Sequence, residues 1–356
     1  MEDKKYKLKE LLTIKNGKDH KPLAEGDYPV YGSGGYMRSV NSFLYDRTSI
    51  LLPRKGTLSN IQYVSGKPFW TVDTIYYTVL NENLYDPYYL FLYLNALDLS
   101  GYDSGASIPS MTSKTYYSLN VELPEKKLQA KVANIIRAYD NLIENNNKRI
   151  KLLEQIAENL YKEWFVRFRF PGYEDVDLEN GLPKEWEYTK LERLANISTG
   201  KCNREDAEED GAYPLFDRSQ EIKRSNVWLK DCEAIIVPGE GTSFIPRYYN
   251  GKFNLHQRCY CVEPLEKGMG FFLYQTLMMY RIYFLYVATG ATVPSLRLNN
   301  FNDFKVLLPK KELCFKYNEI AEKINDEILL LKNKNELLSK QRDMLLPRLM
   351  SGKLEV

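Results

Sequence analysis

The chain has 356 residues, of which 44% are hydrophobic and 27% charged, and its 49 Lys and Arg nearly balance its 47 Asp and Glu for a net charge of +2. These values are typical of a globular protein of about two or three domains, and they exclude a disordered chain, a collagen-like fibre and a multi-span membrane protein. A polyanionic partner therefore has to be bound by locally clustered charge, because the net charge is too small to attract it.

The cysteines and the first residues bear on the cellular compartment. All five cysteines lie in the second half of the chain, and an odd, unevenly distributed set is a poor disulfide framework. Residues 1–5 lead into no apolar stretch of the kind found in signal peptides, and no apolar run is long enough to cross a bilayer. We therefore expect a cytoplasmic protein with no membrane partner.

The most informative feature of the sequence is an internal repeat. The pattern Leu8-x-x-Leu-x-x-Ile-x-x-Gly-Lys recurs 183 residues later from Leu191, and later motifs recur with an offset of 185. Two residues inserted before Tyr213 explain this change of offset. The later pairs are Tyr28-Pro-Val-Tyr with Tyr213-Pro-Leu-Phe, Ile50-Leu-Leu-Pro-x-x-Gly-Thr with Ile235-Ile-Val-Pro-x-x-Gly-Thr, and Gly105-Ala-Ser-Ile-Pro-Ser with Gly290-Ala-Thr-Val-Pro-Ser. The chain therefore contains two copies of one unit.

Each copy consists of a module followed by a long helix. Residues 1–124 and 186–309 are rich in Gly, Pro and Tyr, and β-branched runs at 49–53, 74–80, 234–238 and 258–262 predict short strands. The turn Asp86-Pro87 is expected to open a helix over residues 88–97. After Pro124 and Pro309 the composition changes to Leu, Ile, Glu, Lys and Asn, which predicts long helices that end before Pro171 and at Pro347.

These elements predict an α+β fold with two globular mixed α/β modules, related by the internal repeat and separated by two long antiparallel coiled-coil helices. The expected domains are a first module at 1–124, a first spacer helix and linker at 125–185, a second module at 186–309 and a second spacer helix at 310–356.

The two long helices carry apolar residues at heptad spacing, so we expect them to pair with each other as a coiled coil. An antiparallel pairing with Asn146 opposite Asn335 leaves neither amide buried and unpaired. Other layers that follow from this register are Ile143 with Leu338, Ile150 with Leu331, Trp164 with Tyr317, and Tyr139 with Arg342, the last as a cation–π contact.

No catalytic motif is recognisable in the sequence. It contains neither a phosphate-binding loop nor a Gly-x-Ser-x-Gly elbow. The segment Asp86-Pro87-Tyr88-Tyr89 lacks the second proline of the Asp-Pro-Pro-Tyr tetrapeptide of amino-methyltransferases, and Glu125-x-Lys127 is too common a pattern to indicate a nuclease. Cys259-x-Cys261 lacks the second pair of a zinc site, and both thiols are expected to be buried in the core. We therefore expect no active site, metal or cofactor in this chain.

Cationic and hydrogen-bonding residues gather in a few loops. The turn Arg54-Lys55-Gly56-Thr57 offers two cations and open backbone amides to a phosphate. Its repeat partner, Gly239-Glu240-Gly241-Thr242, has lost both cations, and Arg247 is a candidate to replace them. Arg and Gln side chains also form bidentate contacts with base edges. The candidates for DNA contact are Arg38, Arg54, Lys55, Thr57, Ser107, Ser110, Thr112, Lys114, Arg218, Gln220, Thr242, Arg247, Arg258, Thr292, Ser295 and Arg297.

Each of the two Gly/Pro/Tyr-rich modules ends in Gly-Ala-[Ser/Thr]-[Ile/Val]-Pro-Ser and is followed by Val-x-Leu-Pro and a long helix. In this order of elements the chain resembles the specificity subunit of type I restriction-modification systems. Residues 147–155 and 345–353 look especially like the helix endings of that family. The resemblance covers essentially the whole chain. It implies two target recognition domains for double-stranded DNA and helices that dock two methyltransferase subunits. Restriction and translocation then belong to a separate restriction subunit, and S-adenosylmethionine to the methyltransferase.

Because the loops at 38–42 and 220–224 differ between the two copies, we expect a split, asymmetric DNA target with half-site centres about 34–36 Å apart. Two alternatives stay open. One is a stand-alone DNA methyltransferase or nuclease, which would act unaided. The other is a coiled-coil scaffold whose twin modules bind protein or glycan, and such binding would lack the steep salt dependence of phosphate contacts.

Overall fold

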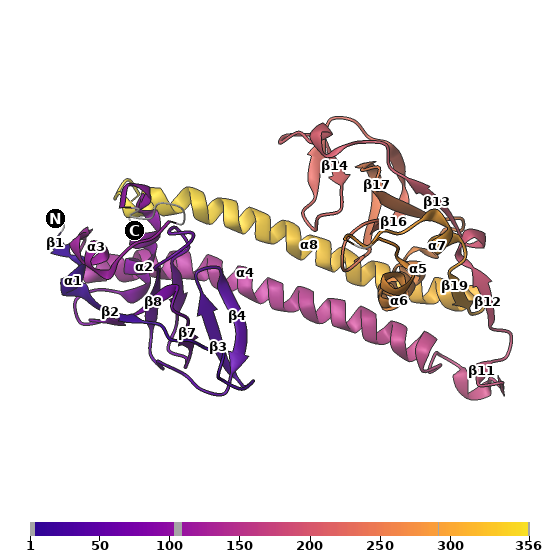
Figure 1. The fold of residues 1–356 in the computed structure, drawn as a ribbon, viewed down its shortest axis with the longest axis horizontal. Helices are drawn as coiled ribbons and strands as arrows, with labels where there is room; N and C mark the ends of the chain where they lie inside the picture. Colours follow the sequence, from indigo (N-terminus) through magenta and orange to yellow (C-terminus); the bar gives the residue numbers. More distant parts are fainter. Residues whose placement is uncertain (1–3, 103–108, 291, 355–356) are drawn as a thin grey trace. The chain divides into compact units, whose positions relative to one another are not determined.

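The computed structural model describes residues 4–102, 109–290 and 292–354. The chain forms two compact units (Figure 1): the first unit comprises Met1–Asn145 and Lys334–Val356, and the second unit comprises Asn146–Asn333. Each unit contains one copy of the repeated module and a part of each long helix. Within the described ranges, no helix is both long and apolar enough to cross a membrane.

The first module begins with a short strand and ends at the first long helix. Its elements in chain order are β1 (Lys4–Lys7), α1 (Leu8–Leu11), β2 (Leu12–Asn16), β3 (Tyr28–Gly32), β4 (Gly35–Val40), β5 (Ser49–Pro53), β6 (Gln62–Val64), β7 (Trp70–Thr71), β8 (Ile75–Leu80), α2 (Pro87–Ala96), η1 (Ser100–Tyr102), α3 (Ser113–Ser118) and β9 (Asn120–Leu123). The long helix α4 (Lys126–Tyr161) follows and continues into the second unit.

The second module repeats this order after a connecting segment. The elements of the connection and the module are η2 (Lys162–Val166), η3 (Tyr173–Asp175), β10 (Leu178–Glu179), β11 (Leu182–Pro183), β12 (Glu187–Lys190), η4 (Leu191–Arg193), β13 (Ala195–Thr199), η5 (Arg204–Asp206), β14 (Tyr213–Phe216), β15 (Lys223–Ser225), β16 (Lys230–Pro238), β17 (Arg247–Leu255), β18 (Cys259–Pro264), α5 (Gly270–Met279), α6 (Arg281–Val287), α7 (Leu298–Asn302) and β19 (Lys305–Leu308). The long helix α8 (Lys311–Met350) returns to the first unit.

Sheet topology confirms the internal repeat. The order β2-β8-β5-β6 in the first module matches β13-β18-β16-β17 in the second. A separate antiparallel pair, β1 with β9 or β12 with β19, joins the start of each module to its end. The register of these pairs preserves the two offsets of the repeat, because Lys4 lies opposite Leu123 and Glu187 opposite Leu308.

The predicted strands and the predicted short helix are present. All five residues of β5 are buried, and so are the last five of β16, which is why both segments read as continuous apolar runs. The Asp86 carboxylate accepts hydrogen bonds from the backbone nitrogens of Tyr88 (2.9 Å) and Tyr89 (3.0 Å), which caps α2. Cys259 and Cys261 are fully buried, as expected.

In the first unit the start of α4 packs antiparallel to the end of α8. Ile136 and Leu349 are buried in the same apolar core, together with residues of α2 and α3. Arg342 forms an ion pair with Asp140 (2.6 Å) and a second with Asp343 (2.8 Å). The expectation of a cation–π contact with Tyr139 is therefore wrong in the described part of this unit, because charge-assisted hydrogen bonds to neighbouring carboxylates are stronger than contact with a ring face.

In the second unit the two helices are antiparallel as well. Ile150, Ile328 and Leu331 form one buried cluster, and the rings of Trp164 and Tyr317 lie 6.1 Å apart. Both observations agree with the predicted register for these layers. The pairings of Asn146 with Asn335 and of Ile143 with Leu338 stay predictions.

Helix α8 continues through Pro347 to Met350, so the prediction that it ends at this proline is wrong. A proline near the end of a helix removes only one hydrogen bond of the ladder. The Pro347 carbonyl still accepts from the backbone nitrogen of Ser351 (3.1 Å), and Leu349 is buried in the core of the first unit. This buried side chain stabilises the last helical turn.

Candidate nucleic-acid interface

Each module brings together two loop motifs that are far apart in the sequence. In the first, the Gly56 nitrogen donates to the Pro109 carbonyl (2.9 Å) and the Met111 nitrogen to the Arg54 carbonyl (3.1 Å). We call residues 54–57 with 109–111 the first paired loop. The repeat-related residues 239–242 with 294–296, the second paired loop, are joined in the same way, by bonds of 3.1 Å and 2.8 Å. The structure thus unites two of the motifs from which the DNA candidates were drawn.

A glycine occupies the same strained position in both paired loops. Gly56 has a φ of +92° and Gly241 a φ of +128°, values that residues with a side chain rarely adopt. The shared conformation explains why both turns keep the Gly-Thr pair while the two residues before it differ. The two modules therefore share the backbone conformation of the paired loop but carry different side chains on it.

The first paired loop presents cations and hydroxyl groups. Arg54 donates from Nη1 to the Asp73 carbonyl (3.3 Å), and its guanidinium lies 6.0 Å from the centre of the Tyr76 ring. Lys55 and Thr57 are exposed, and Ser110 forms a backbone bridge with Lys55.

Two further candidates, Thr112 and Lys114, follow this loop in the chain. Thr112 caps α3 by accepting a hydrogen bond from the Thr115 nitrogen (3.2 Å), and Lys114 in the same helix is exposed. Ser107 lies outside the described residues.

The second paired loop has a carboxylate where the first has Lys55. Glu240 accepts a hydrogen bond from Nη1 of Arg218 (2.5 Å) and forms an ion pair with Nη1 of Arg258 (2.9 Å). The Glu240 side chain is only 15% exposed, whereas those of Arg218 and Arg258 are 47% and 55% exposed. The cations missing from this turn are therefore supplied by Arg218 and Arg258, and both lie within reach of a ligand.

Arg247, proposed above as the replacement, has another role in the structure. It donates from Nη2 to the Asp217 carbonyl (2.5 Å) and from Nη1 to the Ser219 carbonyl (2.8 Å), and its guanidinium lies 5.0 Å from the centre of the Phe216 ring. These contacts hold the backbone on both sides of Arg218. Arg38 is used similarly, with Nη2 donating to the His20 (2.9 Å) and Leu23 (2.6 Å) carbonyls.

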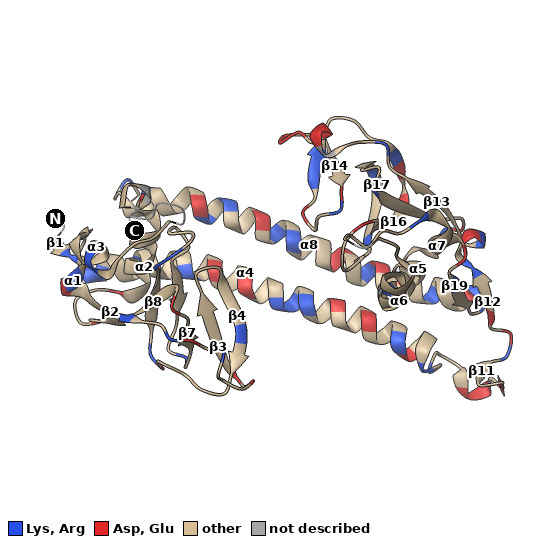
Figure 2. Cartoon of the chain, viewed as in Figure 1, with Lys and Arg blue, Asp and Glu red and all other residues tan. Residues whose placement is uncertain are grey.

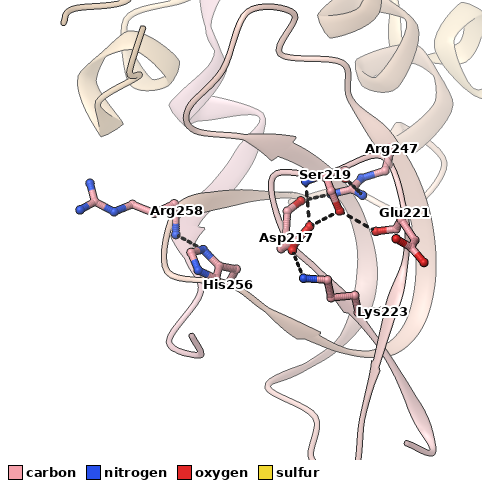
Figure 3. Close-up of polar contacts among 7 residues, drawn as sticks. All are labelled: Asp217, Ser219, Glu221, Lys223, Arg247, His256 and Arg258. Atoms are coloured by element: carbon pink, nitrogen blue, oxygen red, sulfur yellow. Dashed lines mark hydrogen bonds and ion pairs between the residues drawn. The ribbon is translucent and has the colours of Figure 1, made fainter. Parts of the chain in front are cut away.

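A polar cluster fixes the loop that carries Arg218 (Figure 3). The Asp217 carboxylate accepts from the backbone nitrogen (2.7 Å) and Oγ (2.5 Å) of Ser219 and from Nζ of Lys223 (2.7 Å). Burial by itself raises the pKa of the Asp217 carboxyl, but the Lys223 ammonium and the Ser219 donors outweigh it and lower the pKa to about 2. Asp217 is therefore a permanent carboxylate that keeps this loop ordered.

His256 fixes the backbone of Arg258. Its Nδ1 accepts from the Arg258 nitrogen (3.0 Å), and Figure 3 shows the Arg258 side chain extending away from the Asp217 cluster. Burial lowers the pKa of His256, and the nearby Arg218 guanidinium lowers it further. The neutral ring that the hydrogen bond requires is thus the favoured form.

Two of the remaining candidates, Thr242 and Ser295, belong to the second paired loop. Gln220, Thr242, Thr292 and Arg297 are exposed, and Ser295 is half-buried, forming a backbone bridge with Glu240.

The sequence analysis named none of Asp217, Ser219, Lys223 and His256 and did not recognise Glu240 as a partner of two arginines. An aspartate two residues before a serine is a known signal for a side-chain-stabilised turn, so Asp217-Arg218-Ser219 offered the one usable clue.

Comparison with known proteins identifies the family. A model described as "Type I restriction modification DNA specificity domain" matches residues 1–155 and again residues 183–340. The chain belongs to this family. Its two matched segments each cover one module and most of the helix that follows, in agreement with the duplicated sheet topology.

The relatives are specificity subunits. The MjaIX type I restriction enzyme specificity subunit of Methanocaldococcus jannaschii is 24% identical over 372 residues, which cover 94% of this chain and 86% of that protein. The EcoDI specificity subunit of Escherichia coli is 30% identical over 177 residues, or 49% of this chain and 39% of that protein. The chain is thus homologous to the non-catalytic, DNA-recognising subunits of type I restriction-modification systems.

A solved structure has the same fold. The type I restriction-modification S subunit from M. genitalium superposes with a TM-score of 0.68 at 17% identity, covering 98% of this chain and 96% of that chain. This likeness confirms the predicted fold class of two mixed modules combined with two long helices.

Proposed function

We propose that this specificity subunit reads a bipartite, asymmetric DNA target, with each module recognising one half-site. The observation that carries the proposal is the paired loop, which recurs with the same backbone hydrogen bonds but different side chains. A common backbone supports a common way of docking on the duplex, and different side chains support different base sequences. Half-site centres about 34–36 Å apart would allow both modules to read one face of B-DNA.

We further propose that the long helices dock two methyltransferase subunits, to which restriction subunits are added. Apolar side chains on both helices are exposed although the helices already pair with each other: Leu142, Leu337 and Met344 in the first unit, and Leu152, Ile156, Leu329 and Leu330 in the second. Leu330, Leu337 and Met344 follow one another at heptad spacing along α8, which favours a further helix as the partner. S-adenosylmethionine would be bound by the methyltransferase, which would receive the flipped adenine.

The test is co-expression of the chain with its cognate methyltransferase, followed by mapping of methylated adenines across the genome. We expect methylation at one split sequence with an unread spacer, and binding of this DNA that weakens steeply as salt rises. Methylation or cleavage by the chain alone would favour a stand-alone enzyme instead. Absence of salt-dependent binding to DNA would favour the scaffold, whose modules would bind protein or glycan.

A further inference from the structure

Around the paired loops, the two modules carry the same charges at four equivalent positions of the repeat, but on different residues. Each combines two cations with one carboxylate at its four equivalent positions. These pairs, first module before second, are Ser33 and Arg218, Arg54 and Gly239, Lys55 and Glu240, and Asp73 and Arg258. At these four positions the summed charge is therefore the same in both modules, while the residues that carry the cations differ.

We propose that Glu240 is a positioning residue that holds Arg218 and Arg258 as a fork for guanine bases in the half-site read by the second module. The inference rests on the proposed function, and it adds which residues of the second module contact the bases and which base they recognise. Each carboxylate oxygen of Glu240 contacts a single Nη1: Oε2 accepts a hydrogen bond from Arg218, and Oε1 forms an ion pair with Arg258. A guanidinium has five N–H donors, so an arginine bound through one nitrogen still offers two others side by side.

The fork is ordered before DNA arrives. Arg218 lies between two residues, Asp217 and Ser219, whose carbonyls both accept from Arg247. The backbone N–H of Arg258 donates a hydrogen bond to Nδ1 of His256. The backbone carbonyl of Arg258 accepts one from the Gly239 nitrogen (2.8 Å), in the turn that carries Glu240. Both arginines therefore project from fixed backbone, which reduces the entropic cost of ordering them on DNA.

Glu240 also decides which part of the DNA the fork can bind. A phosphate placed against both guanidinium groups would face the Glu240 carboxylate, and this repulsion disfavours phosphate there. Guanine offers the neutral acceptors O6 and N7 in the major groove, and a bidentate arginine is their commonest partner. The first paired loop, with Lys55 in the equivalent position, has no such restriction.

The experiment selects DNA from a randomised duplex library with the chain assembled on its cognate methyltransferase. The variants are Glu240→Gln, which keeps the size of the side chain, and Arg218→Lys and Arg258→Lys, which keep the positive charge. Glu221→Gln, an exposed carboxylate in the loop of Arg218, is the matched control. The double variant Arg54→Ala with Lys55→Ala is the control for the other module.

Wild type and Glu221→Gln are expected to select the same split sequence. Each of the three variants should lower the preference for guanine about tenfold or more at one or two positions of a single half-site, and leave the other half-site unchanged. Arg54→Ala with Lys55→Ala, which removes phosphate contacts of the first module, should weaken binding of all sequences and leave the guanine preference of the second module's half-site unchanged. This pattern would separate positioning by Glu240 from a general loss of folding, which would weaken both half-sites together.

Other outcomes overturn the inference in distinguishable ways. If wild type selects no split sequence, the proposed function fails together with the inference. If wild type selects a split sequence that the three variants leave unchanged, the inference alone fails. If the arginine variants weaken binding equally for all DNA sequences, Arg218 and Arg258 contact phosphates and the inference fails. If the variants change the preference for a base other than guanine, the assignment to guanine is wrong.

Discussion

At the scale of the residue, His256 shows how one neutral side chain supports the candidate site. It is one of two histidines in the chain, and it is buried next to Arg218, Arg258, Asp217 and Glu240. Burial and the two arginines lower the pKa of its imidazole, and the two carboxylates oppose them only in part. A protonated ring would lose the acceptor at Nδ1 that holds the Arg258 nitrogen.

Stability is therefore expected to depend on pH through His256. Because its folded-state pKa lies below the ordinary value of 6.5, its contribution to stability is complete above that pH and is lost as the pH falls through the folded-state pKa. Urea unfolding of the full chain at a series of pH values should show this loss below about pH 6.5 in wild type. His256→Gln should make the dependence shallower. Identical profiles for wild type and His256→Gln would contradict the assignment.

At the scale of the element, helix α8 presents one face to its partner helix and leaves another face apolar and exposed. Leu331 is 1% exposed among Ile150, Ile328 and their neighbours, whereas the adjacent Leu330 is 46% exposed. A heptad pattern alone cannot separate these two residues, since both belong to apolar series. The packed face stabilises the second unit, and the exposed face is the surface proposed for docking.

Truncation of the two leucines should separate these roles. Leu331→Ala removes buried methyl groups and leaves a cavity, so it should lower the free energy of unfolding by about 2–5 kcal/mol. Leu330→Ala should change it by about 0.5 kcal/mol or less, because the side chain is at the surface. Urea denaturation of the full chain measures both values. Equal losses would show that α8 packs through a different face from the one observed.

At the scale of the whole molecule, charge is balanced and locally arranged. Figure 2 shows Lys and Arg interspersed with Asp and Glu along both long helices, and the net charge is only +2. Attraction of DNA must then come from clusters such as the first paired loop. The place from which a cation is removed should matter more than the number removed.

Two double variants that remove the same charge test this expectation. In the assembled complex, Arg54→Ala with Lys55→Ala should reduce the slope of log affinity against log salt by about two, roughly one for each phosphate that the protein no longer neutralises. Lys334→Ala with Lys340→Ala, two exposed lysines of α8, should leave the slope unchanged. Filter binding or fluorescence anisotropy across a salt series gives both slopes. An equal reduction would mean that net charge governs binding.

The sequence by itself determined the duplicated architecture and the family, and it predicted a register for the two long helices. These predictions rest on patterns that are local or periodic along the chain: a fixed repeat offset, a heptad and a helix cap such as Asp86. Such patterns can be recognised in the sequence before the structure is known. The predicted register rests on the cost of burying a polar residue in an apolar seam without a partner, and its pairing of Asn146 with Asn335 stays a prediction. The end of α8 was misjudged because a proline is a local signal, whereas the burial of Leu349 depends on the core of the first unit.

Only the tertiary structure decided which candidate residues share a site and which are bound internally. Arg218 and Glu240 are 22 residues apart, and Arg54 and Met111 are farther still, so their contacts depend on strand order and register. Arg38 and Arg247 read in the sequence as free cations, yet backbone carbonyls bind both. The physical reason is that a guanidinium binds whichever acceptors the fold places near it, and chain position does not reveal them.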